Sequence, residues 1–245
     1  MDVTGFLTDK RKKRMRDVVS KRQFDLTVVL ENIHDPHNIA AVIRSCDAVG
    51  ISEIYAIITD ERIDIERYEM DNKVSSGSRK WVVIHTFRSV EQATAEIRKK
   101  YDKLYGTHMS SQSKSLYDLD FSESIALVFG NEHEGLSDEL LRQLDGNFLI
   151  PQYGMVQSLN ISVACAVSVF EALRQKTNLG QYAESAEWTE NKEELFQHYK
   201  VKSKEHLTFG KEEKMAKIQR QKEERKYRKR LLKAARNSDH AKTKE

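Results

Sequence analysis

Short apolar runs alternate with amphipathic segments along most of this 245-residue chain. Apolar runs too short for helices predict buried strands, and segments with apolar residues at i, i+3 and i+4 predict helices. The predicted strands cover 26–30, 53–58, 81–85, 103–106, 125–129 and 148–150, and the predicted helices cover 10–22, 36–49, 90–100, 137–144 and 159–175. This alternation predicts an α/β fold with a mainly parallel sheet that helices cover on both faces.

The predicted helix 36–49 has the clearest boundaries. Asp35 is a favourable N-cap, Pro36 fits the first helical position, and Gly50 follows the last turn. At about 100° per residue, the apolar residues of this helix gather on one face, and Arg44 lies on the opposite side. We therefore predict that Arg44 is exposed.

Residues 154–162 form a polar, glycine-containing loop that leads into an almost uncharged helix. The first turn of a helix has backbone N–H groups without partners, and a small molecule with suitable acceptors can bind there. The loop therefore predicts a ligand site. A dinucleotide is disfavoured, because the first strand ends in residues 31–35 and no Gly-x-Gly-x-x-Gly follows it.

The formal net charge of +3 conceals a basic arm and a basic tail. Residues 9–22 hold eight Lys or Arg against two acidic residues, and residues 200–245 hold seventeen against seven, so the middle is acidic. Basic arms of this kind are typical of proteins that bind a phosphate backbone. For the tail, solvated charge is an equally good interpretation. We expect three parts: a basic arm at 1–24, an α/β domain at 25–178, and a basic extension at 179–245 that is helical or disordered.

The cysteine pattern and the hydropathy exclude several classes of protein. Cys46 and Cys165 stand in apolar helical patterns without further ligands at metal-binding spacing, so we expect buried thiols and neither disulfide nor metal. No apolar run approaches the roughly 20 residues that span a membrane, and the N-terminus lacks an apolar signal segment. We therefore expect a cytoplasmic protein without a membrane partner.

Three segments together resemble the motifs of the TrmH (SpoU) family, RNA 2′-O-ribose methyltransferases of the SPOUT class. They are residues 30–51 (LENIHDPHNIAAVIRSCDAVGI), 127–136 (LVFGNEHEGL) and 150–160 (IPQYGMVQSLN), which occur in the family's order. The similarity extends over about residues 10–178. It implies a Rossmann-like sheet whose C-terminal part forms a deep trefoil knot.

The resemblance also implies a cofactor and a catalytic site. S-adenosylmethionine is expected in the knot, held mainly by backbone groups, at Thr107, Gly130, Ile150, Met155, Ser158 and Leu159. Methyl transfer is expected at Arg44, Asn38, Glu132 and Asn160. Arg44 would either accept the hydroxyl proton or stabilise the forming alkoxide, and both roles stay open because arginine almost never loses its proton.

The family resemblance extends to the partners. Basic residues at family RNA contacts are Arg11, Arg14, Arg22, Arg174 and Lys176, and a homodimer is expected. The short arm favours tRNA as substrate, with guanosine 18 of the D-loop as the methylated nucleotide. The alternatives are 2′-O-methylation of ribosomal RNA and a non-catalytic RNA-binding or ribosome-assembly factor with the same fold.

Overall fold

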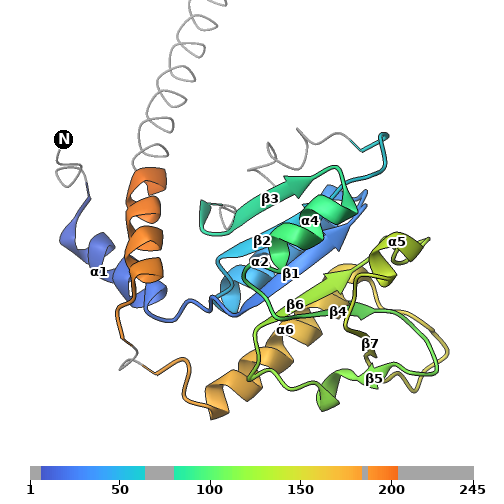
Figure 1. Ribbon diagram of the computed structural model, residues 1–245. Helices are drawn as coiled ribbons and strands as arrows, with labels where there is room; N and C mark the ends of the chain where they lie inside the picture. The colour runs from blue at the N-terminus through green and yellow to red at the C-terminus, as the bar shows by residue number, and fades with distance from the viewer. Residues whose placement is uncertain (1–6, 64–79, 184–186, 204–245) are drawn as a thin grey trace, which may run out of the picture. The chain divides into compact units, whose positions relative to one another are not determined.

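The computed structural model describes residues 7–63, 80–183 and 187–203, and Asp9–Tyr199 form one compact unit. Within the described residues a seven-stranded parallel sheet has the order β3-β2-β1-β6-β4-β7-β5 (Figure 1). Its strands are β1 (Leu26–Glu31), β2 (Glu53–Ile57), β3 (Val83–Phe87), β4 (Lys103–Thr107), β5 (Lys114–Ser115), β6 (Ile125–Phe129) and β7 (Gly146–Leu149). The predicted basic tail lies almost wholly in residues 204–245, outside the described part.

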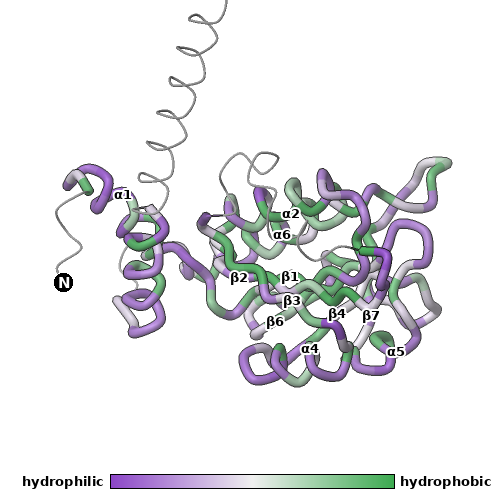
Figure 2. The backbone as a smooth tube through the Cα atoms, turned by 90° about the horizontal axis from the view of Figure 1, so that it is seen from above, coloured by the Kyte–Doolittle hydropathy of each residue, from purple (hydrophilic) through white to green (hydrophobic). Residues whose placement is uncertain are grey.

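Helices cover both faces of this sheet (Figure 2). One face packs against α2 (Pro36–Ala48), α6 (Ile161–Asn178) and the 3-10 helix η3 (Leu116–Asp118). The other packs against α4 (Val90–Ile97) and α5 (Asp138–Leu141). The prediction of a parallel α/β sheet covered on both sides is confirmed.

The central strands β1 and β6 are buried along their whole length. In β1, Val28 and Leu30 pack toward the α2 and α6 face, whereas Val29 packs toward α4. Successive side chains of a strand point to opposite faces, so a strand buried on both sides needs a continuous apolar run. This requirement explains the apolar runs from which these two strands were predicted.

Several predicted boundaries differ from the observed ones. Strand β3 begins at Val83 and not at residue 81, because Trp81 instead packs edge-on against Tyr199, with the ring centroids 4.9 Å apart. Helix α6 begins at Ile161 because Asn160 caps it. The sequence did not reveal β5, which is only two residues long.

The basic arm forms α1 (Asp9–Val19), which is shorter than predicted. Met15 and Val19 are buried, whereas Val18 is 39% exposed. The guanidinium of Arg16 lies 4.5 Å from the ring centre of Trp188, just before a helix that begins at residue 190. The arm therefore packs through both apolar and cation–π contacts.

Helices α2 and α6 pack against each other through their apolar faces, and Cys46 and Cys165 are buried there as free thiols. Burial raises the pKa of the Cys46 thiol, and the neighbouring Cys165 raises it further. The helix start predicted at Asp35 and Pro36 is confirmed, since Asp35 Oδ1 accepts from the backbone N–H of His37 at 2.8 Å. None of the helices in the described ranges has the length and hydropathy required to cross a membrane.

Glu53, at the start of β2, holds together three elements at the amino-terminal edge of the sheet. Its carboxylate accepts hydrogen bonds from Lys100 Nζ at 2.9 Å and from the Tyr101 hydroxyl at 3.0 Å, and it contacts the His85 ring at 3.1 Å. Burial by itself raises the pKa of Glu53, but the bonds to His85, Lys100 and Tyr101 outweigh it and lower the pKa to about 2. The ionised carboxylate is therefore part of the folded structure.

We expect Glu53→Gln to lower the free energy of unfolding at pH 7 by about 1–3 kcal/mol, because the hydrogen bonds lost are to a charged acceptor. Since folding depresses this pKa, the contribution is complete above the ordinary glutamate value near 4.5 and disappears as the pH falls toward about 2. Urea unfolding of both proteins between pH 7 and pH 3 measures the difference. The exposed Glu123→Gln is the control, and a difference independent of pH contradicts the assignment.

Candidate functional site

Three segments that are distant in sequence meet at the carboxyl edge of the sheet. Strands β1, β6, β4 and β7 are neighbours in that order. Helix α2 follows β1, a tight turn at 130–135 follows β6, and the loop 150–160 follows β7. Because all these strands run parallel, the segments after them lie on one edge, which is where α/β proteins bind ligands.

A chain of hydrogen bonds joins these three segments. The Asn38 side chain donates through Nδ2 to Glu132 Oε1 at 2.6 Å and accepts through Oδ1 from Asn160 Nδ2 at 3.1 Å. Asn160 in turn caps α6, since its Oδ1 accepts from the backbone N–H of Ser162 at 2.9 Å. The structure therefore brings together three of the four predicted catalytic residues.

The electrostatic surroundings of the hydrogen bonds between Asn38, Glu132 and Asn160 favour a negatively charged group. Asn38 is in the first turn of α2, and Asn160 is the N-cap of α6, so two helices of 13 and 18 residues begin beside Glu132. Helix N-termini present unpaired N–H groups and a partial positive charge. This edge of the sheet can therefore stabilise a carboxylate, an RNA phosphate or a developing alkoxide.

Arg44 is exposed, as predicted, but it does not take part in the hydrogen-bond chain between Asn38, Glu132 and Asn160. It lies six residues beyond Asn38 on α2, about 9 Å further along the helix axis. Its guanidinium is thus available to a bound substrate.

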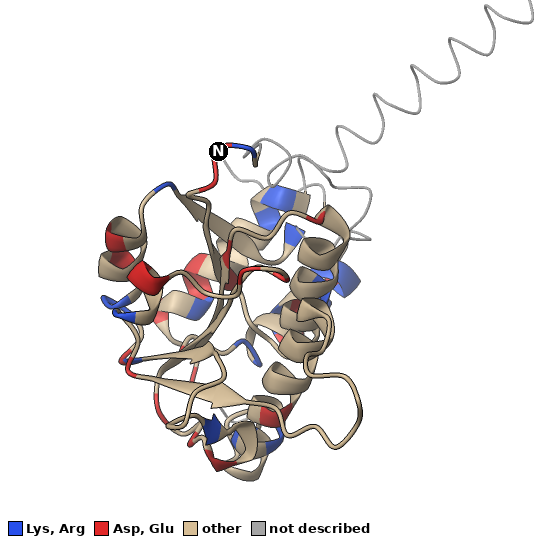
Figure 3. Cartoon of the chain, turned by 90° about the vertical axis from the view of Figure 1, so that its right-hand side faces the viewer, with Lys and Arg blue, Asp and Glu red and all other residues tan. Residues whose placement is uncertain are grey.

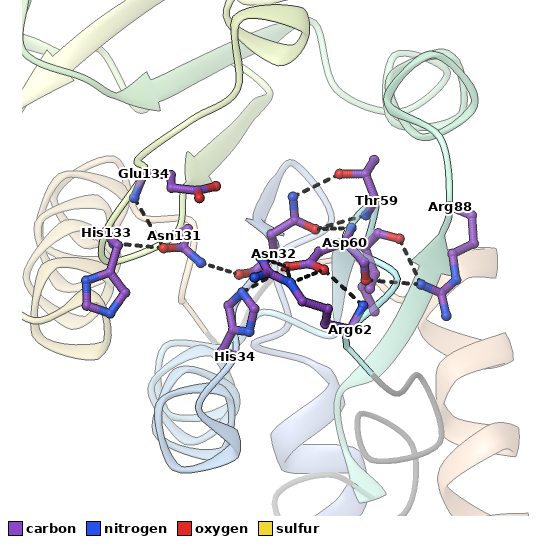
Figure 4. Close-up of polar contacts among 10 residues, drawn as sticks. Asn32, His34, Thr59, Asp60, Arg62, Arg88, Asn131, His133 and Glu134 are labelled. Carbon is purple, nitrogen blue, oxygen red and sulfur yellow. Dashed lines mark hydrogen bonds and ion pairs between the residues drawn. The ribbon is translucent and has the colours of Figure 1, made fainter.

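A second network, which sequence analysis missed, supports the turn that holds Glu132 (Figure 4). Asn32 follows β1 with a positive φ of 50°, and its Oδ1 accepts from the backbone N–H groups of Thr59 and Asp60 at 2.9 and 3.0 Å. Asn131 Nδ2 donates to the Asn32 carbonyl at 2.8 Å, and Asn131 Oδ1 accepts from the His133 N–H at 2.7 Å. The available signal was the asparagine directly after β1, since asparagine tolerates a positive φ.

Two glycines and a buried glutamate complete the support of this turn. A side chain at Gly130 would place its Cβ 2.3 Å from the Gly135 carbonyl, and Gly135 itself has φ +71°. Glu31 is 1% exposed and accepts from the Ser137 hydroxyl at 2.5 Å and from the Ser137 N–H at 2.8 Å. Burial raises the pKa of Glu31, and its bonds to Ser137 only partly oppose this.

The predicted cofactor positions lie on the loops after β4, β6 and β7. Thr107 ends β4 and donates to the Val128 carbonyl at 3.4 Å, Gly130 begins the turn after β6, and Ile150, Met155, Ser158 and Leu159 belong to the loop after β7. No hydrogen bond to another described residue uses the backbone N–H groups of 152–159. Tyr153 and Met155 in this loop are 99% exposed, and Met109 in the loop after β4 is 72% exposed. Unpaired main-chain donors beside apolar side chains fit a cofactor held mainly by backbone.

The predicted RNA contacts divide into exposed and buried residues. Arg14 is exposed, Arg11 is half-buried, and the Arg174 side chain is 61% exposed although Glu171 binds its guanidinium. Arg22 is 3% exposed and donates to the Ile51 carbonyl at 3.0 Å and to Asp47. Lys176 is fully buried and its Nζ lies 2.7 Å from Asp25 Oδ2. The prediction that Lys176 contacts RNA is therefore wrong for this fold, and Arg22 is held by internal bonds.

The sequence and the fold are similar to those of known methyltransferases. Residues 25–170 match the model of the SpoU rRNA Methylase family. The tRNA (guanosine(18)-2′-O)-methyltransferase of Thermus thermophilus is 39% identical over 175 residues, which cover 71% of this chain and 88% of that protein. The crystal structure of the Aquifex aeolicus TrmH/SpoU tRNA modifying enzyme superposes with a TM-score of 0.69 at 32% identity, covering 80% of this chain and 97% of the other. The SpoU methyltransferase AviRb of Streptomyces viridochromogenes, crystallised with the cofactor AdoMet, has a TM-score of 0.56 at 26% identity and covers 64% and 62% of the two chains.

We expect Lys176→Met to lower the free energy of unfolding by about 1–3 kcal/mol, because it removes charged hydrogen bonds to Asp25 and Gln181. The affinity of the folded variant for RNA should stay within about twofold of the original. The matched variant is Arg174→Met, which removes the same charge at an exposed position on the same helix and should weaken RNA binding with little loss of stability. Chemical unfolding and filter binding distinguish the two, and the reverse pattern contradicts the structural role of Lys176.

Proposed function

Because this chain belongs to the SpoU rRNA methylase family, we propose that it transfers the methyl group of S-adenosylmethionine to a ribose 2′-hydroxyl of tRNA, at guanosine 18. The observation that carries this proposal is the chain Glu132–Asn38–Asn160, which unites the three motif segments at one edge of the sheet. Relatives with this activity align with most of this chain and with most of their own length. The exposed loops after β4 and β7 have the chemistry to hold the cofactor.

The proposed mechanism assigns a role to each residue of the site. When bound, S-adenosylmethionine supplies an activated methyl group. Asn38 and Asn160 orient the ribose, because their amide groups are fixed by each other and by the α6 cap. Arg44 stabilises the negative charge on O2′ as the hydroxyl proton leaves to water, since a guanidinium keeps its own proton at neutral pH. Glu132 fixes the direction of the Asn38 amide.

The proposal includes the trefoil knot and a homodimer. Support for the knot comes from η3 and the following loop, which lie against α6: Gln175 of α6 bonds the Phe121 N–H at 3.2 Å and the Leu119 carbonyl at 3.1 Å. Support for the dimer comes from large apolar side chains exposed between residues 153 and 170, namely Tyr153, Met155, Val156, Val163 and Phe170. Such a cluster is typical of a protein interface. A cytoplasmic location and the remaining predicted RNA contacts, Arg11, Arg14 and Arg174, are part of the same proposal.

Ribosomal RNA is the second candidate substrate, because the matching family is named for rRNA methylases. The catalytic residues and the fold suit either RNA, since both offer the same ribose hydroxyl.

The function is tested by methyl transfer from labelled S-adenosylmethionine to two synthetic tRNAs. One has guanosine at position 18, and the matched control has 2′-deoxyguanosine there, which lacks only the acceptor oxygen. We expect label in the first tRNA and none in the second. Equal labelling places the modification elsewhere, and absence of label from both tRNAs contradicts tRNA as the substrate.

Arg44→Ala should reduce kcat by at least about 100-fold, the usual cost of losing one charge-stabilising donor. Since Arg44 is exposed on the outer face of α2, the variant should keep the thermal stability and the cofactor affinity of the original. Single-turnover methylation, differential scanning calorimetry and titration with S-adenosylmethionine check the three quantities. Arg142→Ala, at another exposed arginine, is the control, and a fully active Arg44→Ala removes this residue from the mechanism.

A further inference from the structure

A basic cavity lies beside the amino-terminal edge of the sheet, opposite the edge that holds Asn38 and Glu132. Its volume is about 340 Å³, near the lower end of the roughly 300–1,000 Å³ of small-molecule sites. The lining comes from α1 and the residues after it, the end of α2, and two aromatic residues outside the sheet: Arg11, Arg14, Met15, Val18, Arg22, Asp47, Trp81 and Tyr199. A cavity of this size accommodates one small planar group and not a stretch of folded chain.

The described side chains that line this cavity include more basic than acidic groups. Three arginines line it, and the one lining carboxylate, Asp47, is already bonded to Arg22. Burial lowers the pKa of the adjacent Lys80 ammonium, and the charge of Arg11 lowers it further. Arg22 is 3% exposed, yet its Nε has no hydrogen-bond partner within the described residues. An excess of partly buried positive charge favours an anionic ligand.

The aromatic side of the cavity suits a flat ring. Trp81 is partly exposed, and it is braced from behind by Tyr199, whose hydroxyl donates to the Trp81 carbonyl at 2.6 Å. Aromatic side chains beside basic groups are the usual combination for unpaired nucleotides, in which the base stacks and the phosphate is paired. In Figure 3, red and blue segments are interspersed over most of the body, whereas blue segments gather on helices at the upper right.

We propose that this cavity binds one unpaired nucleotide of the RNA substrate, with the base against Trp81 and the phosphate at Arg14. This inference rests on the proposed function, since it takes RNA as the ligand. The nucleotide bound here is not the methylated one, because the cavity and the Asn38 site lie at opposite edges of the sheet. The basic sequence of residues 204–245 makes the chain's own tail an unfavourable occupant of a positive cavity.

Fluorescence tests this binding without any methyl transfer. The chain contains two tryptophans, so Trp188→Phe leaves Trp81 as the sole indole emitter while an aromatic ring remains at 188. A short, 5′-phosphorylated, single-stranded oligoribonucleotide should quench the Trp81 emission with saturation. Inorganic phosphate and a poly-glutamate peptide should not produce the same quenching. Absence of quenching by the oligoribonucleotide overturns the proposal, as does equal quenching by the acidic peptide.

Substitutions then distinguish the contribution of the base to binding from that of the phosphate. Trp81→Leu should weaken binding of a labelled oligoribonucleotide by about 5- to 150-fold, the range for losing one base–aromatic stack, and Trp81→Phe should weaken it less. The Tyr199 bond is made to the backbone of residue 81, so both variants retain it. Unchanged affinity of Trp81→Leu, with calorimetry showing that it is folded, overturns the proposal.

Arg14→Gln should reduce the slope of log affinity against log salt by about one, as expected for one lost phosphate contact. Lys13→Gln is the matched control, because it removes the same charge from the next residue of α1, which does not line the cavity. Equal effects of both substitutions indicate diffuse attraction and overturn the assignment. The two assays keep this inference separate from the proposed function. If the proposed function is wrong, no methyl transfer is measured, whereas quenching of Trp81 by the oligoribonucleotide is still observed.

Discussion

Two hydrogen bonds of a single amide group hold the site together. The Asn38 side chain binds Glu132 and Asn160, which lie 94 and 122 residues away along the chain. Asn160 uses its oxygen to cap α6, so only its NH₂ group can face Asn38. The Asn38 oxygen is thereby occupied, and its own NH₂ group has to point to the Glu132 carboxylate. The orientation of the Asn160 amide therefore sets the orientation of the Asn38 amide. The Asn160 amide is itself oriented by the backbone N–H of Ser162 in the first turn of α6, which has no partner within the helix.

The parallel sheet makes this convergence possible. Since all the neighbouring strands end at one edge, the segments after β1, β6 and β7 meet without long connections. The meeting is then made rigid by polar side chains beneath the site: Asn32 and Asn131 bond the loops to one another, and Glu31 holds Ser137. A buried carboxylate such as Glu31 would be unfavourable without these partners, so its position is tied to the turn that it supports.

The two edges of the sheet have different chemistry. The carboxyl edge presents helix N-termini, amides and apolar loops, which suit a cofactor and a reacting ribose. At the amino-terminal edge lie the Glu53 carboxylate, with its bonds to Lys100 and Tyr101, and the basic cavity with Trp81. Methyl transfer needs accurate positioning of a few atoms, whereas recognition of a large RNA benefits from contacts far from the reacting atoms. We infer that this separation lets one compact unit do both.

The sequence by itself determined the order of the five predicted helices and of the strands other than β5, the exposure of Arg44 and the start of α2 at Asp35. These features depend on local periodicity and on caps, which neighbouring residues define. Only the tertiary structure decided that Lys176 pairs internally with Asp25, although the family resemblance had implied an RNA contact there. It also decided that Asn32 and Asn131 brace the Glu132 turn and that Trp81 faces a cavity. Burial and hydrogen-bond partners depend on residues distant in sequence, so local patterns do not encode them.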